Sequence, residues 1–199
     1  MRQLIIICSI LLLSNTSNWI SVEYFSKEMV ETFYQNKDCT SLLLVSVKSQ
    51  KLYHLNNYTV IEEYPISTSK YGLGSTPRSF KTPLGLFSVT SKHGSNEVIG
   101  TVFYNAEPSS EVATIYTDQT DTEEDKITSR VIKLDGLEPG KNKGPGVDTY
   151  SRKIYIHGTD EEGLIGKPAS HGCIRMKNED IILLFEKIDT MYKVLIVDQ

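Results

Sequence analysis

The sequence predicts a mainly β protein with one or two short helices. Short runs of apolar and β-branched residues, separated by polar turns, recur along most of the chain, and such runs are typical of strands. Only two segments carry apolar residues at the spacing of three to four that indicates an amphipathic helix. With 199 residues, 39% of them hydrophobic, the chain is long enough for one sizeable core, but two full domains would be tight.

Residues 1–20 differ in composition from the rest of the chain. Arg2 precedes residues 4–13, which are apolar except for Ser9, and a polar stretch follows. This layout is typical of a secretory signal peptide, and the apolar run is short for a bilayer span. We therefore expect residues 1–20 to be a signal peptide or, if uncleaved, an N-terminal anchor that makes the protein's only membrane contact. The protein would then be exported, to the periplasm or the cell envelope.

Residues 21–39 are expected to form a short helix or linker, and residues 40–199 the main domain. The helix is predicted by four apolar residues at helical spacing: Val22, Phe25, Met29 and Phe33. The domain opens with apolar runs at 41–47, 51–55 and 59–66, whose short polar turns indicate an antiparallel meander. The net charge is −4 and no basic run with interleaved aromatic residues is present, so the sequence gives no electrostatic case for nucleic acid.

The middle of the chain is less regular. Glycine and proline punctuate residues 67–85, so we expect a loop there before the next strand. Further strands are predicted within residues 91–150, and the acidic run 118–125 between them is expected to be a solvated turn. The strand that follows the loop is predicted at 86–90, and the strands within residues 91–150 are predicted at 98–104, 113–116 and 127–134.

The C-terminal part is predicted to hold a helix and a closing strand. Asn178 is the expected N-cap, with acidic residues in the first turn, and the apolar residues that follow mark one helix face. The apolar run 192–197 then reads as a buried strand.

Reactive side chains are concentrated in residues 154–176. A thiol at Cys173, imidazoles at His157 and His171, and the guanidinium of Arg175 lie there among glycines and small residues. A thiol becomes an effective nucleophile when an imidazole partner takes its proton. The small residues allow backbone N–H groups to approach a carbonyl oxygen, as an oxyanion hole requires. Arg175 suits a carboxylate ligand. We therefore interpret Cys173 as a nucleophile.

Three other interpretations remain open for these residues. A zinc ion held by His157, His171 and Cys173 is one, but the spacing fits the usual paired ligands poorly. A purely structural Cys/His cluster is the second. The third is a disulfide between Cys39 and Cys173, the two cysteines left after export. We favour Cys39 as a free, partly buried thiol.

Two motifs resemble those of the L,D-transpeptidase (YkuD-type) catalytic domain. One is the pair formed by HGT at 157–159 and SHGCIRM at 170–176, and the other is TPLGLF at 82–87. The opening strands are also similar, so the resemblance covers about residues 41–198, with 91–150 the weakest part. It implies a β-sandwich or barrel-type catalytic domain. Residues 91–150 are long for a connection and are expected to form a cap over the cleft, with Tyr104 and the 141–146 loop as possible lining.

The resemblance implies a role for each matching residue. Cys173 would attack the bond between an L-centre and a D-centre in a peptidoglycan stem tetrapeptide, release D-alanine and become a thioester. His157 would be the general base, and His171 would maintain the geometry of the site. Backbone N–H groups of Gly172 and Cys173 would form the oxyanion hole.

The same resemblance implies the substrate contacts and the acceptor. Arg175, Ser170 and Gly158 would contact the donor stem, and Ser170 would also orient the turn. A second stem would supply the amine that resolves the thioester to give a 3→3 cross-link, or a wall-attached lipoprotein would supply it. No metal or other cofactor is implied. Alternatives are an L,D-carboxypeptidase or hydrolase with the same residues, and an inactive peptidoglycan-binding protein.

Overall fold

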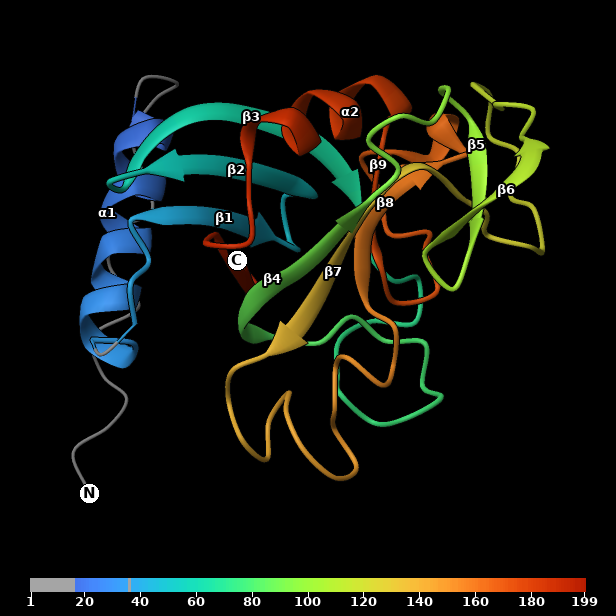
Figure 1. The fold of residues 1–199 in the computed structure, drawn as a ribbon. Helices are drawn as coiled ribbons and strands as arrows, with labels where there is room; N and C mark the ends of the chain where they lie inside the picture. The colour runs from blue at the N-terminus through green and yellow to red at the C-terminus, as the bar shows by residue number, and fades with distance from the viewer. Residues whose placement is uncertain (1–16, 36) are drawn as a thin grey trace.

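The computed structural model describes residues 17–199 apart from residue 36. Residues 1–16 of the predicted signal peptide therefore lie outside the described residues. The fold is a mixed sheet of ten strands with two α-helices and one 3-10 turn, η1 (Glu162–Leu164) (Figure 1). The strands are β1 (Ser41–Ser46), β2 (Lys51–Asn56), β3 (Thr59–Ser67), β4 (Gly85–His93), β5 (Thr101–Tyr104), β6 (Glu107–Val112), β7 (Ile127–Gly136), β8 (Tyr155–Thr159), β9 (Ile174–Met176) and β10 (Lys193–Val197).

The sheet closes on itself into a barrel. Its strand order is β4-β10-β1-β2-β3-β9-β8-β7-β5-β6. An additional pairing between β4 and β7 closes the ring. Only β5 and β6 lie outside this ring, as a hairpin at one end of the molecule (Figure 1). The β1–β10 and β8–β9 pairs are parallel and the other pairs are antiparallel. The predicted mainly β, barrel-type fold and the opening meander are confirmed.

Strand β1 shows why the core is divided into two layers. Successive side chains of a strand point to opposite faces. Leu43 and Val45 enter the main core inside the barrel, whereas Leu42 and Leu44 enter a second core on the outer face. Because both faces are covered, β1 reads as a continuous apolar run and not as an alternating one.

Helix α1 (Ser17–Phe33) covers that outer face (Figure 1). Val30 is buried against the second core, and Phe25 and Met29 pack beside it. The predicted helix is therefore present, and it packs directly on the barrel. Among the described residues no helix is both long and apolar enough to cross a membrane.

The structure differs from the predicted elements at three places. Strand β6 occupies residues 107–112, a polar segment whose side chains are mostly exposed, so it carries no apolar pattern. The predicted strand 113–116 is loop. Helix α2 (Asn178–Lys187) begins at Asn178 and has Lys177 at the N-cap position. The Asn178 side chain is buried and accepts hydrogen bonds from Thr128 and Ser129, so it links α2 to β7 and does not cap the helix.

Candidate active site

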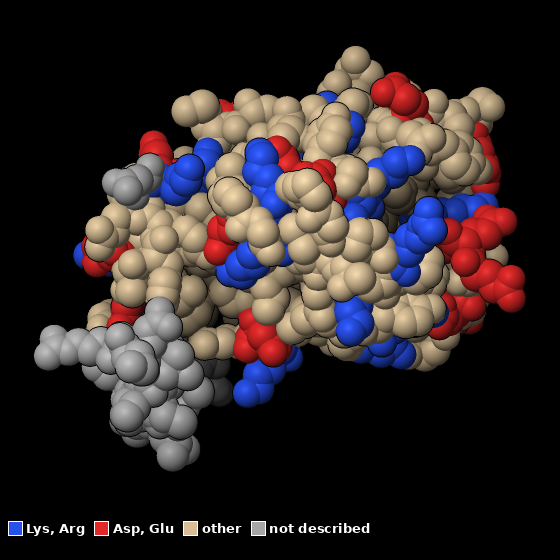
Figure 2. All heavy atoms as spheres, turned by 90° about the horizontal axis from the view of Figure 1, so that it is seen from below, with Lys and Arg blue, Asp and Glu red and all other residues tan. Residues whose placement is uncertain are grey.

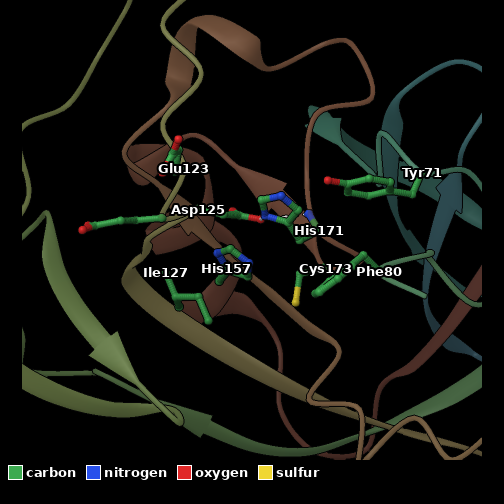
Figure 3. Close-up of a pocket in the computed structure, with 9 residues that line it drawn as sticks. Tyr71, Phe80, Glu123, Asp125, Ile127, His157, His171 and Cys173 are labelled. Atoms are coloured by element: carbon green, nitrogen blue, oxygen red, sulfur yellow. Dashed lines mark hydrogen bonds and ion pairs between the residues drawn. The ribbon is translucent and has the colours of Figure 1, made fainter. Parts of the chain in front are cut away.

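A pocket of about 500 Å³ lies where the cysteine turn, strand β8 and two loops meet (Figure 3). The 67–85 loop and the acidic run contribute its opposite walls. Its lining residues are Tyr71, Phe80, Glu123, Glu124, Asp125, Ile127, His157, His171 and Cys173. The structure thus brings three of the predicted site residues, Cys173, His157 and His171, to one cavity.

Cys173 is the last residue before strand β9 and is half-buried. Its Sγ lies 3.4 Å from the Tyr155 backbone N–H, which donates to it, and 3.4 Å from the Lys153 carbonyl oxygen, to which it donates. Burial raises the pKa of the Cys173 thiol to about 12. The resting thiol is therefore neutral near pH 7, and it needs a base to become a nucleophile. Neither Cys173 nor Cys39 is in a disulfide.

His157 lies on β8, directly beside β9 in the parallel pair. Its Nδ1 is 2.7 Å from the Gly158 carbonyl oxygen. A carbonyl only accepts hydrogen bonds, so Nδ1 carries the proton and Nε2 keeps its lone pair. Burial lowers the pKa of His157 below its ordinary value, which favours the neutral ring. His157 is therefore held in the tautomer that a general base requires.

Two hydroxyl groups fix the cysteine turn. Ser170 Oγ donates to the Cys173 carbonyl at 2.7 Å and accepts from the Gly172 N–H at 3.2 Å. Thr82 Oγ1 donates to the Gly172 carbonyl at 3.0 Å. Because Ser170 already uses the Gly172 N–H, the Cys173 N–H is the better placed of the two predicted oxyanion donors.

Gly172 itself could not be replaced without strain. Its φ is +120°, and a Cβ there would lie 3.3 Å from the carbonyl oxygens of Phe80 and Lys81. The glycine thus allows the 67–85 loop to pack closely against the turn that carries the nucleophile.

His171 is oriented by an acidic residue and two aromatic rings. Its Nδ1 and its backbone N–H both lie 2.8 Å from Asp125 Oδ2. The ring stacks on Tyr71, with centroids 5.6 Å apart, and meets Phe80 edge-on at 5.7 Å. Figure 3 shows His171 between the Asp125 carboxylate and the Tyr71 ring. These contacts fix the orientation of the His171 ring beside the turn that carries Cys173.

Arg175 is fully buried and does not line the pocket. Its Nη1 lies 2.5 Å from Glu161 Oε2, and its Nη2 lies 2.6 Å from Asp125 Oδ1. Because the guanidinium is buried and lies outside the pocket lining, a substrate carboxylate in the pocket does not contact it. The sequence predicted that Arg175 contacts a substrate carboxylate. In the structure its partners are instead the Glu161 and Asp125 carboxylates of the protein itself.

Gly158 and Ser170 are also buried and do not line the pocket. A Cβ on Gly158 would lie 2.7 Å from both Asn178 Oδ1 and the Thr128 carbonyl oxygen. The residue therefore permits close packing of β8 against β7 and α2. Gly158 also orients the neighbouring His157 ring, because its carbonyl accepts the hydrogen bond from His157 Nδ1.

Sequence reasoning missed the role of the acidic run. Asp125, expected in a solvated turn, is only 11% exposed and pairs with His171 and Arg175. Glu161, its counterpart on the other side of Arg175, is fully buried. From the predicted cap, Glu123, Glu124, Asp125 and Ile127 line the pocket, whereas Tyr104 and the 141–146 loop do not line it. No spacing in the sequence relates Asp125 to residues so far along the chain.

Similar proteins are known. A curated Escherichia coli (strain K12) protein, "Probable L,D-transpeptidase YbiS", is 45% identical over 51 residues, which are 25% of this chain and 17% of that protein. Another, "Probable L,D-transpeptidase ErfK/SrfK", is 43% identical over 51 residues, 25% of this chain and 16% of that protein. The matches thus span under one fifth of these relatives.

The fold has a solved counterpart in L,D-transpeptidase 3 from Mycobacterium tuberculosis, determined with a faropenem-derived adduct. The TM-score is 0.50 at 19% identity, over 80% of this chain and 60% of that chain. A family model described as the L,D-transpeptidase catalytic domain, YkuD, matches residues 40–196. With most of the chain matched and the cysteine and histidine motifs in one pocket, this protein belongs to the YkuD family of L,D-transpeptidase catalytic domains.

Proposed function

We propose that this protein transfers the acyl group of a peptidoglycan stem peptide to an amine through a Cys173 thioester. The observation that carries the proposal is that Cys173 and His157 line one pocket, while the contact of His157 Nδ1 with the Gly158 carbonyl leaves Nε2 to accept a proton. Family membership supplies the substrate class, since L,D-transpeptidases act on peptides with an L-centre followed by a D-centre. Export follows from a wall substrate, as residues 1–20 also predict.

The first half of the reaction acylates the enzyme. The Cys173 side chain rotates away from the Lys153 carbonyl, and its S–H proton passes to His157 Nε2. Sγ attacks the carbonyl carbon between the L- and D-centres, and the Cys173 N–H stabilises the oxyanion. The C–N bond then breaks, His157 returns the proton to the leaving nitrogen, and D-alanine departs. The product is a thioester on Cys173.

The second half transfers the acyl group. The acceptor arrives as an ammonium and first releases one proton to solvent. The resulting neutral amine loses a second proton to His157 as it attacks the thioester carbonyl; the C–S bond breaks and the Cys173 sulfur regains that second proton. Glu123, Glu124 and Asp125 form one wall of the pocket. This wall favours a positively charged acceptor over a neutral one, because opposite charges attract in a partly desolvated cavity. The acidic wall favours transfer to an amine over transfer to water.

His171 and Arg175 are proposed as positioning residues in this scheme. Asp125 connects them, and His171 adjoins the turn that carries Cys173. The donor stem would then be bound by Tyr71 and Phe80, the aromatic residues on the wall opposite Asp125 (Figure 3).

The test incubates the purified protein with a disaccharide tetrapeptide and follows both products and intact protein by mass spectrometry. We expect a cross-linked dimer, released D-alanine and a transient mass gain on Cys173. Cys173→Ala should abolish the mass gain and the dimer. Cys39→Ala removes the other described thiol, which is buried outside the pocket, and should retain both. Free tripeptide without dimer would indicate a hydrolase, and no turnover by the wild type would overturn the proposal.

A further inference from the structure

A second pocket, of about 320 Å³, lies beside the active-site pocket and shares Glu124 with it. Asp160, only 2% exposed, is the buried member of its lining. Asp160 directly follows β8, and His157 lies three positions earlier on that strand. Three extended residues span about 10 Å, so the two pockets are neighbours along one strand.

The Asp160 carboxylate has an unused oxygen. Oδ1 is buried and has no hydrogen-bond partner among the residues that the structure describes. A buried polar atom without a partner carries a desolvation cost, so such an atom in a pocket indicates a missing ligand. The nearby Lys126 does not supply it, because its Nζ lies 2.6 Å from Glu111 Oε1 and 3.2 Å from Glu124 Oε2.

The charge of this pocket selects a cation. Glu111, Glu124 and Asp160 line it, and Lys126 is the single basic side chain in the lining. Figure 2 shows acidic side chains gathered at the end of the molecule where Figure 1 places β6. In residues 17–199 without residue 36, no three His, Cys, Asp or Glu side chains are arranged to hold a metal ion.

An organic ammonium fits the hydrogen-bond acceptors that line this pocket. A primary ammonium donates three hydrogen bonds, and the pocket offers it the free Asp160 oxygen, the Glu124 carboxylate and the Thr122 hydroxyl. Tyr116 lines the same pocket, and its ring supplies a face that attracts cations.

We propose that this second pocket binds a primary ammonium group of a peptide substrate whose reacting end lies at Cys173. The inference rests on the proposed function, since that function supplies a peptide at Cys173. One peptide can reach both places because the two pockets adjoin at Glu124. The ammonium belongs to the side chain of the peptide that acylates Cys173, because the amine of the acceptor must itself reach the thioester.

The occupancy of the pocket should depend on pH. Burial, with the neighbouring Glu161 carboxylate, raises the pKa of Asp160 to about 6. The other charged groups around it are Glu111, Glu124 and Lys126 in the pocket, and Arg175, which pairs with Glu161. Asp160 is anionic above about pH 6, where a lysine-like ammonium is still charged. Affinity for the cation should therefore fall as the pH drops below 6.

Binding is tested without catalysis, in the Cys173→Ala protein, by calorimetry with two peptides. One is a tetrapeptide with lysine before its terminal D-alanine, and the other is its Nζ-acetyl counterpart. Asp160→Asn, which keeps the shape of the side chain, should weaken binding of the lysine peptide about tenfold and leave the acetylated peptide unchanged. Asp121→Asn makes the same charge change in the acidic run but lines neither pocket, so it should change neither affinity.

A second measurement tests whether the pocket serves the acceptor instead. The thioester is formed on Cys173 with the acetylated peptide and then resolved with the lysine peptide, whose Nζ is the nucleophile. Resolution in the Asp160→Asn protein should proceed at the wild-type rate, and slower resolution with unchanged calorimetric binding would overturn the inference. An unchanged preference for the lysine peptide in the calorimetric measurement, or no binding of either peptide, overturns the inference. Failure of the proposed function appears separately, as a wild-type protein that binds peptides but forms no thioester.

Discussion

The Asp125 carboxylate accepts a hydrogen bond from the His171 backbone N–H, and the same oxygen also lies 2.8 Å from His171 Nδ1 in the ring; the hydrogen bond too is 2.8 Å long. Its other oxygen lies 2.6 Å from the buried Arg175 guanidinium. One residue of an acidic surface loop is thereby fixed against the turn that carries Cys173. The loop and the turn consequently form one unit, and the pocket wall is held at a set distance from the thiol.

The first prediction concerns this contact. Asp125→Ala should lower kcat about 100-fold, because a small misplacement of reacting groups is costly, and should lower the free energy of unfolding by about 3 kcal/mol, because Arg175 loses a partly buried partner. Steady-state kinetics and urea denaturation measure the two effects. Asp121→Asn, in the same loop, is the control and should alter neither. Wild-type kinetics in the Asp125→Ala protein would show that the loop is not coupled to the turn.

The second prediction concerns Arg175. The Glu161 side chain is fully buried and pairs with Arg175. Arg175→Met leaves Glu161 as a buried carboxylate without its cation, and should cost about 3–5 kcal/mol of stability. Adding Glu161→Gln removes that charge, so the double variant should recover part of the loss. Thermal denaturation of the two single variants and the double variant gives the coupling energy.

A substrate-binding role for Arg175 leads to a different result. In that case Arg175→Lys would raise KM at unchanged melting temperature, because only the contact with the substrate would be lost. The buried pairing predicts the reverse, a lower melting temperature because lysine cannot reproduce two ion pairs in the guanidinium geometry.

The third prediction is a pH profile. Burial lowers the pKa of His157 and raises that of Cys173 to about 12, so both groups are neutral around pH 7. The acid limb of kcat/KM should therefore fall below the ordinary histidine pKa of 6.5. Iodoacetamide should alkylate Cys173 slowly at pH 7, and the rate should still be rising at pH 9. Fast alkylation at pH 6 would indicate a preformed thiolate–imidazolium pair.

The same His157 shift has a consequence for stability. Its pKa is lower in the folded than in the unfolded protein, so the unfolded state binds the proton more readily. The stabilising contribution is fully present above about pH 6.5 and is lost as the pH falls toward the folded-state pKa. His157→Gln should make the unfolding free energy less dependent on pH in that range, as measured by urea denaturation at several pH values.

The local sequence determined much of the fold and the chemical centre of the site. The meander β1–β3 and the motif residues His157 and Cys173 could be predicted because apolar runs and short motifs are local signals. Asp125 and Glu161 could not, since their partner, Arg175, is brought to them only when β9 pairs with β8 and β8 pairs with β7. Strand β6 could not be predicted for a related reason. Its side chains are mostly exposed, so it carries no apolar pattern, and only its pairing with β5 makes it a strand.

The fourth prediction concerns Thr82, which connects the 67–85 loop to the cysteine turn. Its hydroxyl donates to the Gly172 carbonyl at 3.0 Å and accepts from the Ser69 N–H at 3.0 Å. Thr82→Val has nearly the same shape but leaves both buried groups unpaired, which should cost about 1–3 kcal/mol and lower kcat. Thr82→Ser retains the hydroxyl and should recover most of the activity. Equal activity of the two variants would exclude a role for this hydroxyl.

The fifth prediction uses Asp160 to test its burial independently of any ligand. Its pKa is raised to about 6 in the folded protein from an ordinary value of 3.8, so the folded state holds the proton more tightly than the unfolded state. Stability should therefore fall as the pH rises from about 4 to 6, by on the order of 1–3 kcal/mol, and then level off. Asp160→Asn cannot ionise and should be more stable than the wild type at pH 8. At pH 4 the two proteins should be nearly equal. Urea denaturation at both pH values measures the difference, and a variant less stable than the wild type at pH 8 would mean that the carboxylate has a partner inside the fold. Because no peptide is present in this measurement, it reports the free-energy cost of burying the Asp160 carboxylate separately from the affinity of the pocket for an ammonium.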